Sequence, residues 1–381
     1  MSSASPSGTV GVGIIGSRFI ARAHAESLSR FVPAARLAAV ASPTAAHREE
    51  FAREFGIPHS YADYREMLRD RDVDVVIVGA PNDLHAPMVI AAAEAGKHVI
   101  LEKPMAVTLD EADRMIAACA AARVRLLYAE ELVFSPKYVR AHRLVEEGAL
   151  GNLYLVKQLE KHSGPHAPWF WDVDRSGGGV LFDMGCHGIE FARWMYGKRP
   201  VAAVTGHCAL VRHADRTRAD DNCIVLLEFE GGGTALIDDS WAFFGGMDDR
   251  AELYGTEGSI QCDIVHGSAM KTFSNAGYGY AMEKAASTQG YTFTIFEENW
   301  NYGFPQELAH FIDCIRFDRP ARETGEDGRE VLRIIFAAYE SAATGRRIAL
   351  EGYQPRFPQR PIESWLRRQD GATPARSGAR S

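Results

Sequence analysis

The first third of the chain alternates short apolar runs with longer amphipathic segments, and this rhythm constrains the fold more than any single motif. Five runs are typical of buried parallel strands because they are short, β-branched and almost continuously apolar. The predicted strands are 10–15, 37–41, 73–79, 97–101 and 124–128, and the predicted helices between them are 19–29, 45–55, 87–95 and 109–121. Such alternation predicts an α/β fold with a doubly wound parallel sheet over residues 9–128.

The pattern changes after residue 128, where strands follow one another across short turns such as Glu230-Gly231-Gly232-Gly233. Predicted strands are 152–160, 201–211, 221–230, 233–243, 250–254 and 258–263, and predicted helices are 141–147, 180–196, 303–317 and 328–343. This predicts an α+β domain over residues 129–350, built on a mainly antiparallel open sheet. Residues 351–381 are predicted to form a C-terminal extension, disordered over 367–381 where Arg, Gly, Ser and Ala dominate.

Composition excludes several classes of protein. A net charge of -8 argues against a nucleic-acid binder, which needs a basic surface. No apolar run approaches the ~18 residues of a membrane span, and the N-terminal residues do not resemble a secretory signal. Six cysteines without a Cys-x-x-Cys pair favour reduced thiols in the cytoplasm over disulfides or a zinc site.

A glycine-rich stretch near the N-terminus indicates a dinucleotide site of the Rossmann type. Residues 11–16 match the Gly-x-Gly-x-x-Gly fingerprint, but they lie inside the first predicted strand, whereas phosphate must meet the turn that leaves the strand. We therefore place the phosphate site in the turn at 16–21, with an ordinary glycine turn as the alternative. The predicted contacts are Gly16, the backbone amides of Ser17, Arg18, Phe19 and Ile20, and the charge of Arg18.

The end of the second predicted strand bears on the choice of cofactor. An NAD-preferring site usually has an acidic residue there to hold the ribose hydroxyls, and this chain has Ser42 instead. Ser42, with His47 or Arg48 nearby, suits a 2'-phosphate. The sequence therefore predicts NAD(P) with a lean toward NADP.

The candidate catalytic residues are Lys103, Asp183 and His187. Lys103 ends a predicted strand at the carboxyl edge of the sheet, and Pro104 keeps it extended. Asp183 and His187 are four residues apart on a predicted helix and so share a face. Removal of hydride from a carbinol needs a base, and desolvation would bring the pKa of Lys103 down toward ~7–8. We predict that Lys103 is the principal proton-transfer residue, assisted by His187 and positioned by Asp183. The alternative is a surface lysine beside a helix-stabilising pair.

An ordered set of motifs resembles the Gfo/Idh/MocA family of glucose-fructose oxidoreductase and inositol dehydrogenase over residues 9–350. The motifs are 13–16 (Gly-Ile-Ile-Gly), 80–85 (Ala-Pro-Asn-Asp-Leu-His), 95–99 (Ala-Gly-Lys-His-Val), 102–104 (Glu-Lys-Pro), 176–179 (Ser-Gly-Gly-Gly), and Asp183 with His187. The resemblance implies that Glu102 and Lys103 lie near the nicotinamide. It also implies that Pro81, Asn82 and His85 border the cofactor. Arg18 and Ser42 depart from the family pattern.

A polar and aromatic loop at 160–172 precedes the predicted catalytic helix, and we expect it to line a sugar pocket. The candidate substrate contacts there are His162, His166, Trp169 and Trp171, beside Lys103, Asp183 and His187. A metal bound by Glu160, His162, His166 or His187 is the weaker alternative, because no pair has zinc-ligand spacing, and no metal is predicted. Glu130 and Glu131 fit a surface acid pair better than a pocket.

Together these features predict an NAD(P)-dependent dehydrogenase or reductase of a sugar, sugar derivative or cyclitol. A redox glycosidase that oxidises its substrate transiently and a non-catalytic nucleotide sensor remain as alternatives. We expect no nucleic acid and no membrane as partners. A homodimer or homotetramer is expected because strand 221–230 is apolar on both faces, with Cys223, Val225, Leu227 and Phe229 on one and Ile224 and Leu226 on the other.

Overall fold

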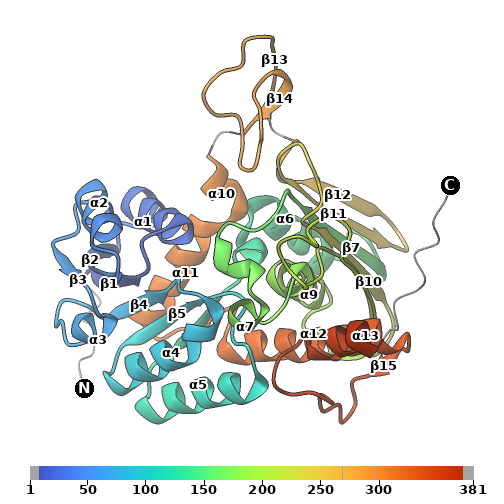
Figure 1. Ribbon diagram of the computed structural model, residues 1–381, viewed down its shortest axis with the longest axis horizontal. Coiled ribbons are helices and arrows are strands. Elements are labelled where there is room, and N and C mark those ends of the chain that lie inside the picture. The colour runs from blue at the N-terminus through green and yellow to red at the C-terminus, as the bar shows by residue number, and fades with distance from the viewer. Residues whose placement is uncertain (1–7, 268, 296, 372–381) are drawn as a thin grey trace.

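A computed structural model describes residues 8–267, 269–295 and 297–371 of the chain (Figure 1). Its first sheet has six strands in the order β3-β2-β1-β4-β5-β6, and every neighbouring pair is parallel. The strands are β1 (Val10–Ile15), β2 (Ala35–Ala41), β3 (His59–Tyr61), β4 (Val75–Val78), β5 (His98–Glu102) and β6 (Leu126–Ala129). The predicted doubly wound parallel sheet is confirmed.

Helices connect these strands and cover the sheet: α1 (Phe19–Phe31), α2 (Ala45–Phe55), α3 (Tyr64–Met67), α4 (His85–Glu94) and α5 (Leu109–Ala122), with a 3-10 turn η1 (Asn82–Leu84) before α4. A capping box begins α5, in which the Thr108 hydroxyl accepts from the Glu111 amide and the Glu111 carboxylate accepts from the Thr108 amide. The sequence missed β3 and α3, because a three-residue edge strand and a single helical turn are too short to show a period.

The second sheet has seven strands in the order β12-β11-β7-β10-β9-β8-β15. They are β7 (Leu153–Lys161), β8 (Val201–Ala209), β9 (Asn222–Phe229), β10 (Thr234–Ser240), β11 (Asp248–Gly255), β12 (Ser259–Asp263) and β15 (Ile348–Ala349). All pairs are antiparallel except β7 with β10. The mainly antiparallel second sheet is therefore confirmed.

The remaining helices pack around this sheet and at its junction with the first. They are η2 (Glu131–Phe134), α6 (Pro136–Glu146), η3 (Pro168–Trp171), α7 (Val173–Ser176), α8 (Val180–Asp183), α9 (Gly185–Met195), α10 (Glu298–Tyr302), α11 (Phe304–Phe317), α12 (Gly325–Thr344) and α13 (Glu363–Gly371). α9 lies against β7 and β10 and is buried along its whole length. Among the described residues, none of the helices combines the length and apolar character that crossing a bilayer requires.

The single helix predicted at 180–196 is wrong, because it is interrupted at Met184. In a continuous helix the amide of His187 would donate to the carbonyl of Asp183. Instead it donates to the carbonyl of Met184, and the Asp183 carbonyl accepts from Lys103 Nζ and Cys186 Sγ. The interruption thus gives a main-chain oxygen to a lysine from the other sheet.

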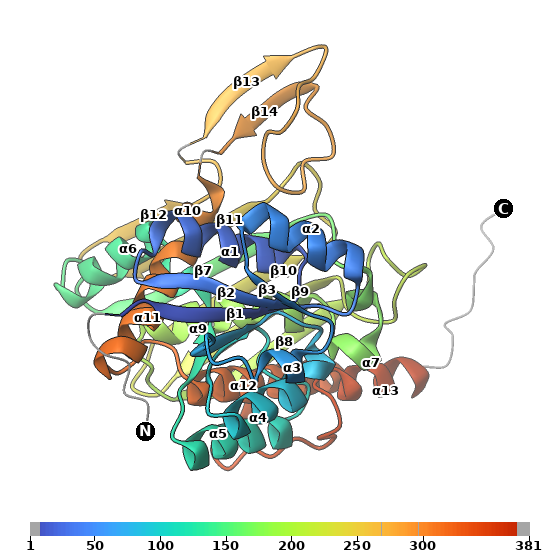
Figure 2. The same cartoon turned by 90° about the vertical axis from the view of Figure 1, so that its left-hand side faces the viewer.

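Several elements of the second half were not predicted, among them a hairpin and the helix α13. The hairpin of β13 (Met270–Ser274) and β14 (Gly290–Thr294) stands away from the body of the protein (Figures 1 and 2). The prediction of disorder from residue 367 is wrong as far as 371, because these residues end α13, in which Trp365 and Leu366 are buried. The rest of that prediction, 372–381, lies outside the described residues.

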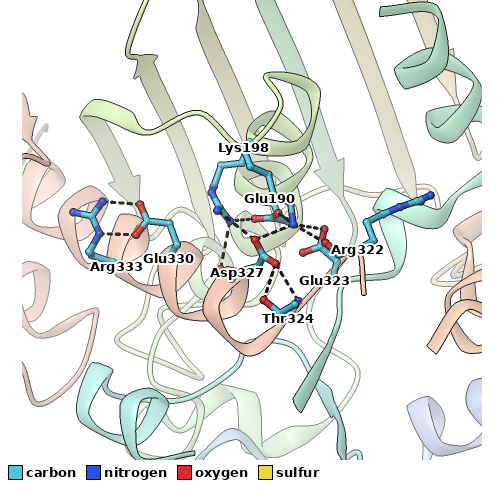
Figure 3. A network of polar contacts seen from close by, with 9 residues as sticks. Glu190, Lys198, Arg322, Glu323, Thr324, Asp327, Glu330 and Arg333 are labelled. Atoms are coloured by element: carbon cyan, nitrogen blue, oxygen red, sulfur yellow. Dashed lines mark hydrogen bonds and ion pairs between the residues drawn. The ribbon is translucent and has the colours of Figure 1, made fainter. Parts of the chain in front are cut away.

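An ionic network in which Glu190 and Glu323 are fully buried joins α9 to the start of α12 (Figure 3). The ammonium of Lys198 contacts three carboxylates, with Nζ–O distances of 3.3, 3.0 and 2.8 Å to Glu190, Glu323 and Asp327. The chain at Glu323 also runs beside the first sheet, since its carbonyl accepts from the Tyr128 amide of β6. The network therefore ties α9 to the edge of the first sheet.

Candidate active site

The turn that leaves β1 has the geometry of a dinucleotide-binding turn. Gly16 has a φ of +119°, and a Cβ there would lie 2.5 Å from the carbonyl oxygen of Gly79, so only glycine fits. The helix α1 begins at Phe19, and its N-cap, Arg18, makes no side-chain capping bond. The letters that match the fingerprint at 11–16 lie mostly inside β1, as predicted, and a Cβ on Gly11 would lie 1.8 Å from the carbonyl oxygen of Asp72. The free amides at the start of α1 fit a pyrophosphate.

Ser42 lies at the end of β2, directly beside this turn. Its hydroxyl accepts a 2.9 Å hydrogen bond from the Ser17 hydroxyl, and both residues are buried. Arg48 reaches the same place, where its Nη1 donates to the Ser42 carbonyl at 2.7 Å. The position that an acidic residue would occupy in an NAD-preferring site thus holds a hydroxyl with a guanidinium nearby.

A loop of the second half lies over the phosphate turn. The ring of His166 stacks on Phe19 with centroids 4.3 Å apart and planes 6° from parallel. His166 Nδ1 lies 2.9 Å from Glu283 Oε1, and Lys284 Nζ donates to the Gly164 carbonyl at 2.6 Å. The loop is therefore held on one side by the start of α1 and on the other by residues 283–284.

Residues of the 80–85 motif form hydrogen bonds to main-chain carbonyl groups around the candidate site, including that of Pro104 in the 102–104 motif. Asn82, which follows Pro81, donates from Nδ2 to the Ser176 carbonyl at 2.7 Å and so links the two halves. His85 is fully buried, with Nδ1 3.1 Å from the Pro104 carbonyl oxygen and Nε2 3.0 Å from that of Ala80. These contacts hold the segment that follows Lys103.

The side chain of Glu102 points toward α1 in the first half of the chain. Its Oε1 lies 2.6 Å from Nε2 of His24 on α1, and its Oε2 accepts from the amide of Lys103. His24 and Glu102 are both buried. The pair therefore anchors the end of β5 to α1, the helix that begins at the phosphate turn.

Lys103, Asp183 and His187 come together at the carboxyl edge of the first sheet. Lys103 Nζ lies 3.2 Å from the carbonyl oxygen of Asp183 and 3.4 Å from its Oδ1. His187 Nδ1 lies 2.5 Å from Glu130 Oε1, and its Nε2 lies 3.8 Å from Glu131 Oε1. Asp183, His187, Glu130 and Glu131 are buried, and the side chain of Lys103 is 18% exposed.

The prediction of a surface acid pair at Glu130 and Glu131 is wrong. Glu130 is completely buried and Glu131 is 9% exposed. The signal that could have found them is their position directly after β6, because β6 pairs with β5 and its end lies beside Lys103. Glu130, Cys186 and His187 also place potential metal-ligand atoms within 4.8 Å of one another, although Glu130 and Cys186 are already bonded to His187 and to the Asp183 carbonyl.

The surroundings give Lys103 and His187 opposite charge states. Burial alone would lower the pKa of Lys103, but Asp183, Cys186, Glu131 and Glu160 outweigh it and raise that pKa well above its ordinary value. The predicted fall toward neutrality is therefore wrong, and Lys103 is an ammonium. Burial and then the charge of Lys103 lower the pKa of His187 to about 4, so its imidazole is neutral at pH 7.

The four predicted loop contacts divide into two groups. His162 is buried near Lys103, and burial followed by the charges of Lys284, His166 and Lys103 hold its pKa well below the usual range. Trp171 instead packs edge-on against Trp241, and Trp169 stacks on Phe170. The structure brings the two histidines toward the candidate site, and it directs Trp171 into a neighbouring aromatic cluster.

A Rossmann sheet with a dinucleotide turn, and a lysine and a histidine at its carboxyl edge, define the class of NAD-binding oxidoreductases. Residues 10–130 match the family described as "Oxidoreductase family, NAD-binding Rossmann fold", and residues 138–261 match the "GFO/IDH/MocA C-terminal domain". The chain belongs to the Gfo/Idh/MocA family, as its motifs predicted.

Its relatives are sugar and cyclitol dehydrogenases and related oxidoreductases. The chain is 30% identical to the uncharacterized oxidoreductase YrbE of Bacillus subtilis over 89% of this chain and 96% of that one. It is 29% identical to myo-inositol 2-dehydrogenase of Thermotoga maritima over 89% and 98%. The crystal structure of GenD2 from gentamicin A biosynthesis in complex with NAD superimposes with a TM-score of 0.85 at 31% identity, covering 91% of this chain and 98% of that one. The chain is thus an enzyme of the NAD-binding oxidoreductase type.

Proposed function

We propose that the protein oxidises a hydroxyl-bearing carbon of a sugar, sugar derivative or cyclitol by transferring hydride to a nicotinamide cofactor, with His187 as the proton acceptor. The observation that carries this proposal is the position of Lys103, held by Asp183, and of His187, held by Glu130, at the carboxyl edge of the first sheet. In these surroundings the pKa of Lys103 is raised and that of His187 is lowered. The relative named myo-inositol 2-dehydrogenase supports the substrate class. A bound nicotinamide supplies the hydride acceptor.

The roles of the two side chains follow from their charge states. We assign the ring proton of His187 to Nδ1, which then donates to Glu130, and this leaves Nε2 free to accept the proton of the substrate hydroxyl. Burial raises the pKa of Glu130 well above its ordinary value, and the charge of Lys103 opposes that rise. The ammonium of Lys103 cannot act as the base while it is charged. It stabilises the negative charge that develops on the substrate oxygen, and Asp183 holds it in place through two contacts. This assigns the proton transfer to His187 rather than to Lys103.

A panel of sugars and cyclitols, each offered with NAD⁺ and with NADP⁺, tests the proposal through the absorbance of the reduced nicotinamide. We expect stoichiometric cofactor reduction with at least one compound. Cleavage of a glycoside without net reduction would instead indicate a redox glycosidase, and binding of cofactor without any turnover would indicate a nucleotide sensor.

We further propose that the enzyme accepts NADP(H), because Ser42 offers a hydroxyl and Arg48 a positive charge where an acidic residue would repel a 2'-phosphate. Ser42→Asp is expected to shift the ratio of kcat/KM for NADP⁺ over NAD⁺ toward NAD⁺ by about tenfold or more, equivalent to ~1.4 kcal/mol. Steady-state kinetics with both cofactors measure this ratio, and Ser259→Asp, at an exposed position of β12 in the second sheet, is the control. Strong selectivity of the unmodified enzyme for NAD⁺ would contradict the proposal.

The second sheet leads us to propose a homo-oligomer. In β9 Cys223, Val225 and Leu227 are fully buried, whereas Ile224 is 43% and Leu226 36% exposed, so the outer face keeps apolar side chains uncovered. Light scattering at micromolar concentration should give at least twice the chain mass of 41.9 kDa.

Leu226→Glu should dissociate this oligomer, because it places charge at the centre of the contact. Phe317→Glu, a change at an exposed apolar residue of α11, is the matched control and should leave the mass unchanged. A monomeric wild-type protein would refute the oligomer.

A further inference from the structure

Three neighbouring strands of the second sheet each carry a buried acidic residue at the same level. Glu160 of β7 is paired in register with Asp239 of β10 on one side and with Asp249 of β11 on the other. Asp239 and Asp249 are completely buried, and Glu160 is 7% exposed. Like charges directly opposite one another destabilise a sheet, and buried carboxylates without partners are rare in native proteins. This row of carboxylates therefore needs an explanation.

Among the described residues, only some of the oxygen atoms of these three carboxylates accept a hydrogen bond. Asp239 Oδ1 accepts from the Glu160 amide at 2.9 Å, and Asp249 Oδ1 accepts from the Tyr138 hydroxyl at 2.7 Å. The second carboxylate oxygen of Asp249 and Oε2 of Glu160 are buried without a hydrogen-bond partner. The hydroxyl of Tyr302 on α10 is likewise buried without a hydrogen-bond partner. The negative charges of Asp249 and Glu160 both raise the pKa of this hydroxyl. Unpartnered polar atoms are thus present on β7, β11 and α10.

This place adjoins the catalytic group. The negative charge of Glu160 raises the pKa of Lys103. Asp249 and Glu131 repel each other electrostatically, and Glu131 lies 3.8 Å from His187 Nε2. The charge of Lys103 favours the ionised form of Glu160, and that of Lys161 favours the ionised form of Asp239, but Lys103 is already held by Asp183 and Lys161 by Asp238. Negative groups in this part of the site therefore outnumber the positive ones.

The protein tolerates this excess only by shifting protonation. Burial raises the pKa of Glu160 well above its usual range, with Asp249 and Asp239 adding to the effect. Burial likewise raises the pKa of Asp249 to about 8 and that of Glu131 to about 7. A cation brought between these groups would restore their charged forms and satisfy the orphaned oxygens.

We infer that the substrate is a sugar or cyclitol that carries an ammonium group, bound against Glu160 and Asp249 while the hydroxyl to be oxidised faces His187 and Lys103. The inference deepens the proposed function and rests on it. An ammonium offers three donors, which match Glu160 Oε2, Asp249 Oδ2 and the Tyr302 oxygen. The row of carboxylates is then a specificity element that selects an amino sugar or aminocyclitol over its neutral counterpart.

The wild-type enzyme is tested first, with D-glucose against its 2-, 3-, 4- and 6-amino-deoxy derivatives, and scyllo-inositol against scyllo-inosamine. We expect kcat/KM for at least one amino compound to exceed that of its neutral counterpart about tenfold or more. N-acetylation of that compound, which removes the charge, should abolish the preference. Neutral compounds that are turned over as well as or better than every amine would overturn the inference and leave the proposed dehydrogenase activity intact.

If no compound is turned over, the proposed function fails, and calorimetric titration of the same amines into the protein with NAD⁺ decides the inference separately. Binding of an amine but not of its hydroxyl counterpart supports it, and binding of neither overturns it.

A variant then assigns the preference to the row. Glu160→Gln removes one negative charge and should lower the ratio of kcat/KM for the amine over the neutral compound about tenfold. Asp238→Asn is the matched control, because Asp238 lies on the opposite face of the same sheet and pairs with Lys161. An unchanged ratio in Glu160→Gln would overturn the assignment. If Glu160→Gln does not fold, Tyr302→Phe, which removes only the unpartnered hydroxyl, replaces it with the same expected direction.

Discussion

Lys103→Ala is expected to lower kcat by ~10²–10⁴-fold while the Kd for the cofactor changes little. The reason is that Asp183 holds the ammonium of Lys103 at the carboxyl edge of the sheet, where we propose that it stabilises negative charge on the reacting oxygen. Steady-state kinetics with the best substrate of the panel, together with fluorescence titration of the reduced cofactor, separate the effect on turnover from that on binding.

The matched control is Lys271→Ala on the projecting hairpin, where the ammonium lies over the ring of Tyr291 and is remote in the fold from the cluster around His187. It should turn over as the wild type does. A Lys103→Ala enzyme with near wild-type kcat would remove Lys103 from the mechanism.

Glu130→Gln is expected to lower kcat by ~10²-fold or more with the cofactor Kd preserved. In the proposed mechanism a carboxylate at this place accepts a hydrogen bond from His187 Nδ1 and leaves Nε2 as an acceptor. The amide of a glutamine can donate to Nδ1, which would move the ring proton to Nε2 and block acceptance there. The measurement is kcat and KM for substrate and for cofactor.

Partial rescue by Glu130→Asp distinguishes this positioning role from a purely structural one, because the aspartate keeps the acceptor while it changes the packing. Thermal unfolding of both variants checks that the buried cluster is still formed. If Glu130→Gln and Glu130→Asp lose kcat equally, the tautomer of His187 is not set by Glu130.

Sequence reasoning succeeded where local chemistry decides and failed where distant segments meet. The strands around Gly16 follow from runs of β-branched residues, and Lys103 follows from its place at a strand end. The interruption at Met184 could not be predicted, because helical spacing says nothing about a lysine eighty residues earlier that takes the Asp183 carbonyl.

The charge states show the same limit. The pKa of Lys103 is raised by carboxylates from three separate segments, so burial alone gave the wrong direction. The sequence alone is compatible with Glu130 and Glu131 on the surface. Only the pairing of β5 with β6 shows that they lie beside His187. Trp171 was a plausible pocket residue, and its contact with Trp241 depends on a strand seventy residues away.

The network around Lys198 has a consequence for protein engineering. Since Glu190 belongs to the helix that carries His187 and Glu323 runs along the edge strand of the cofactor half, the two halves share one set of buried charges. A chimera spliced after residue 129, with its second half taken from a relative, would leave some of those charges unmatched, and removing one partner of a buried pair costs ~3–5 kcal/mol. Transplanting substrate preference into this scaffold therefore calls for exchange of side chains within the pocket, because the halves are not interchangeable modules.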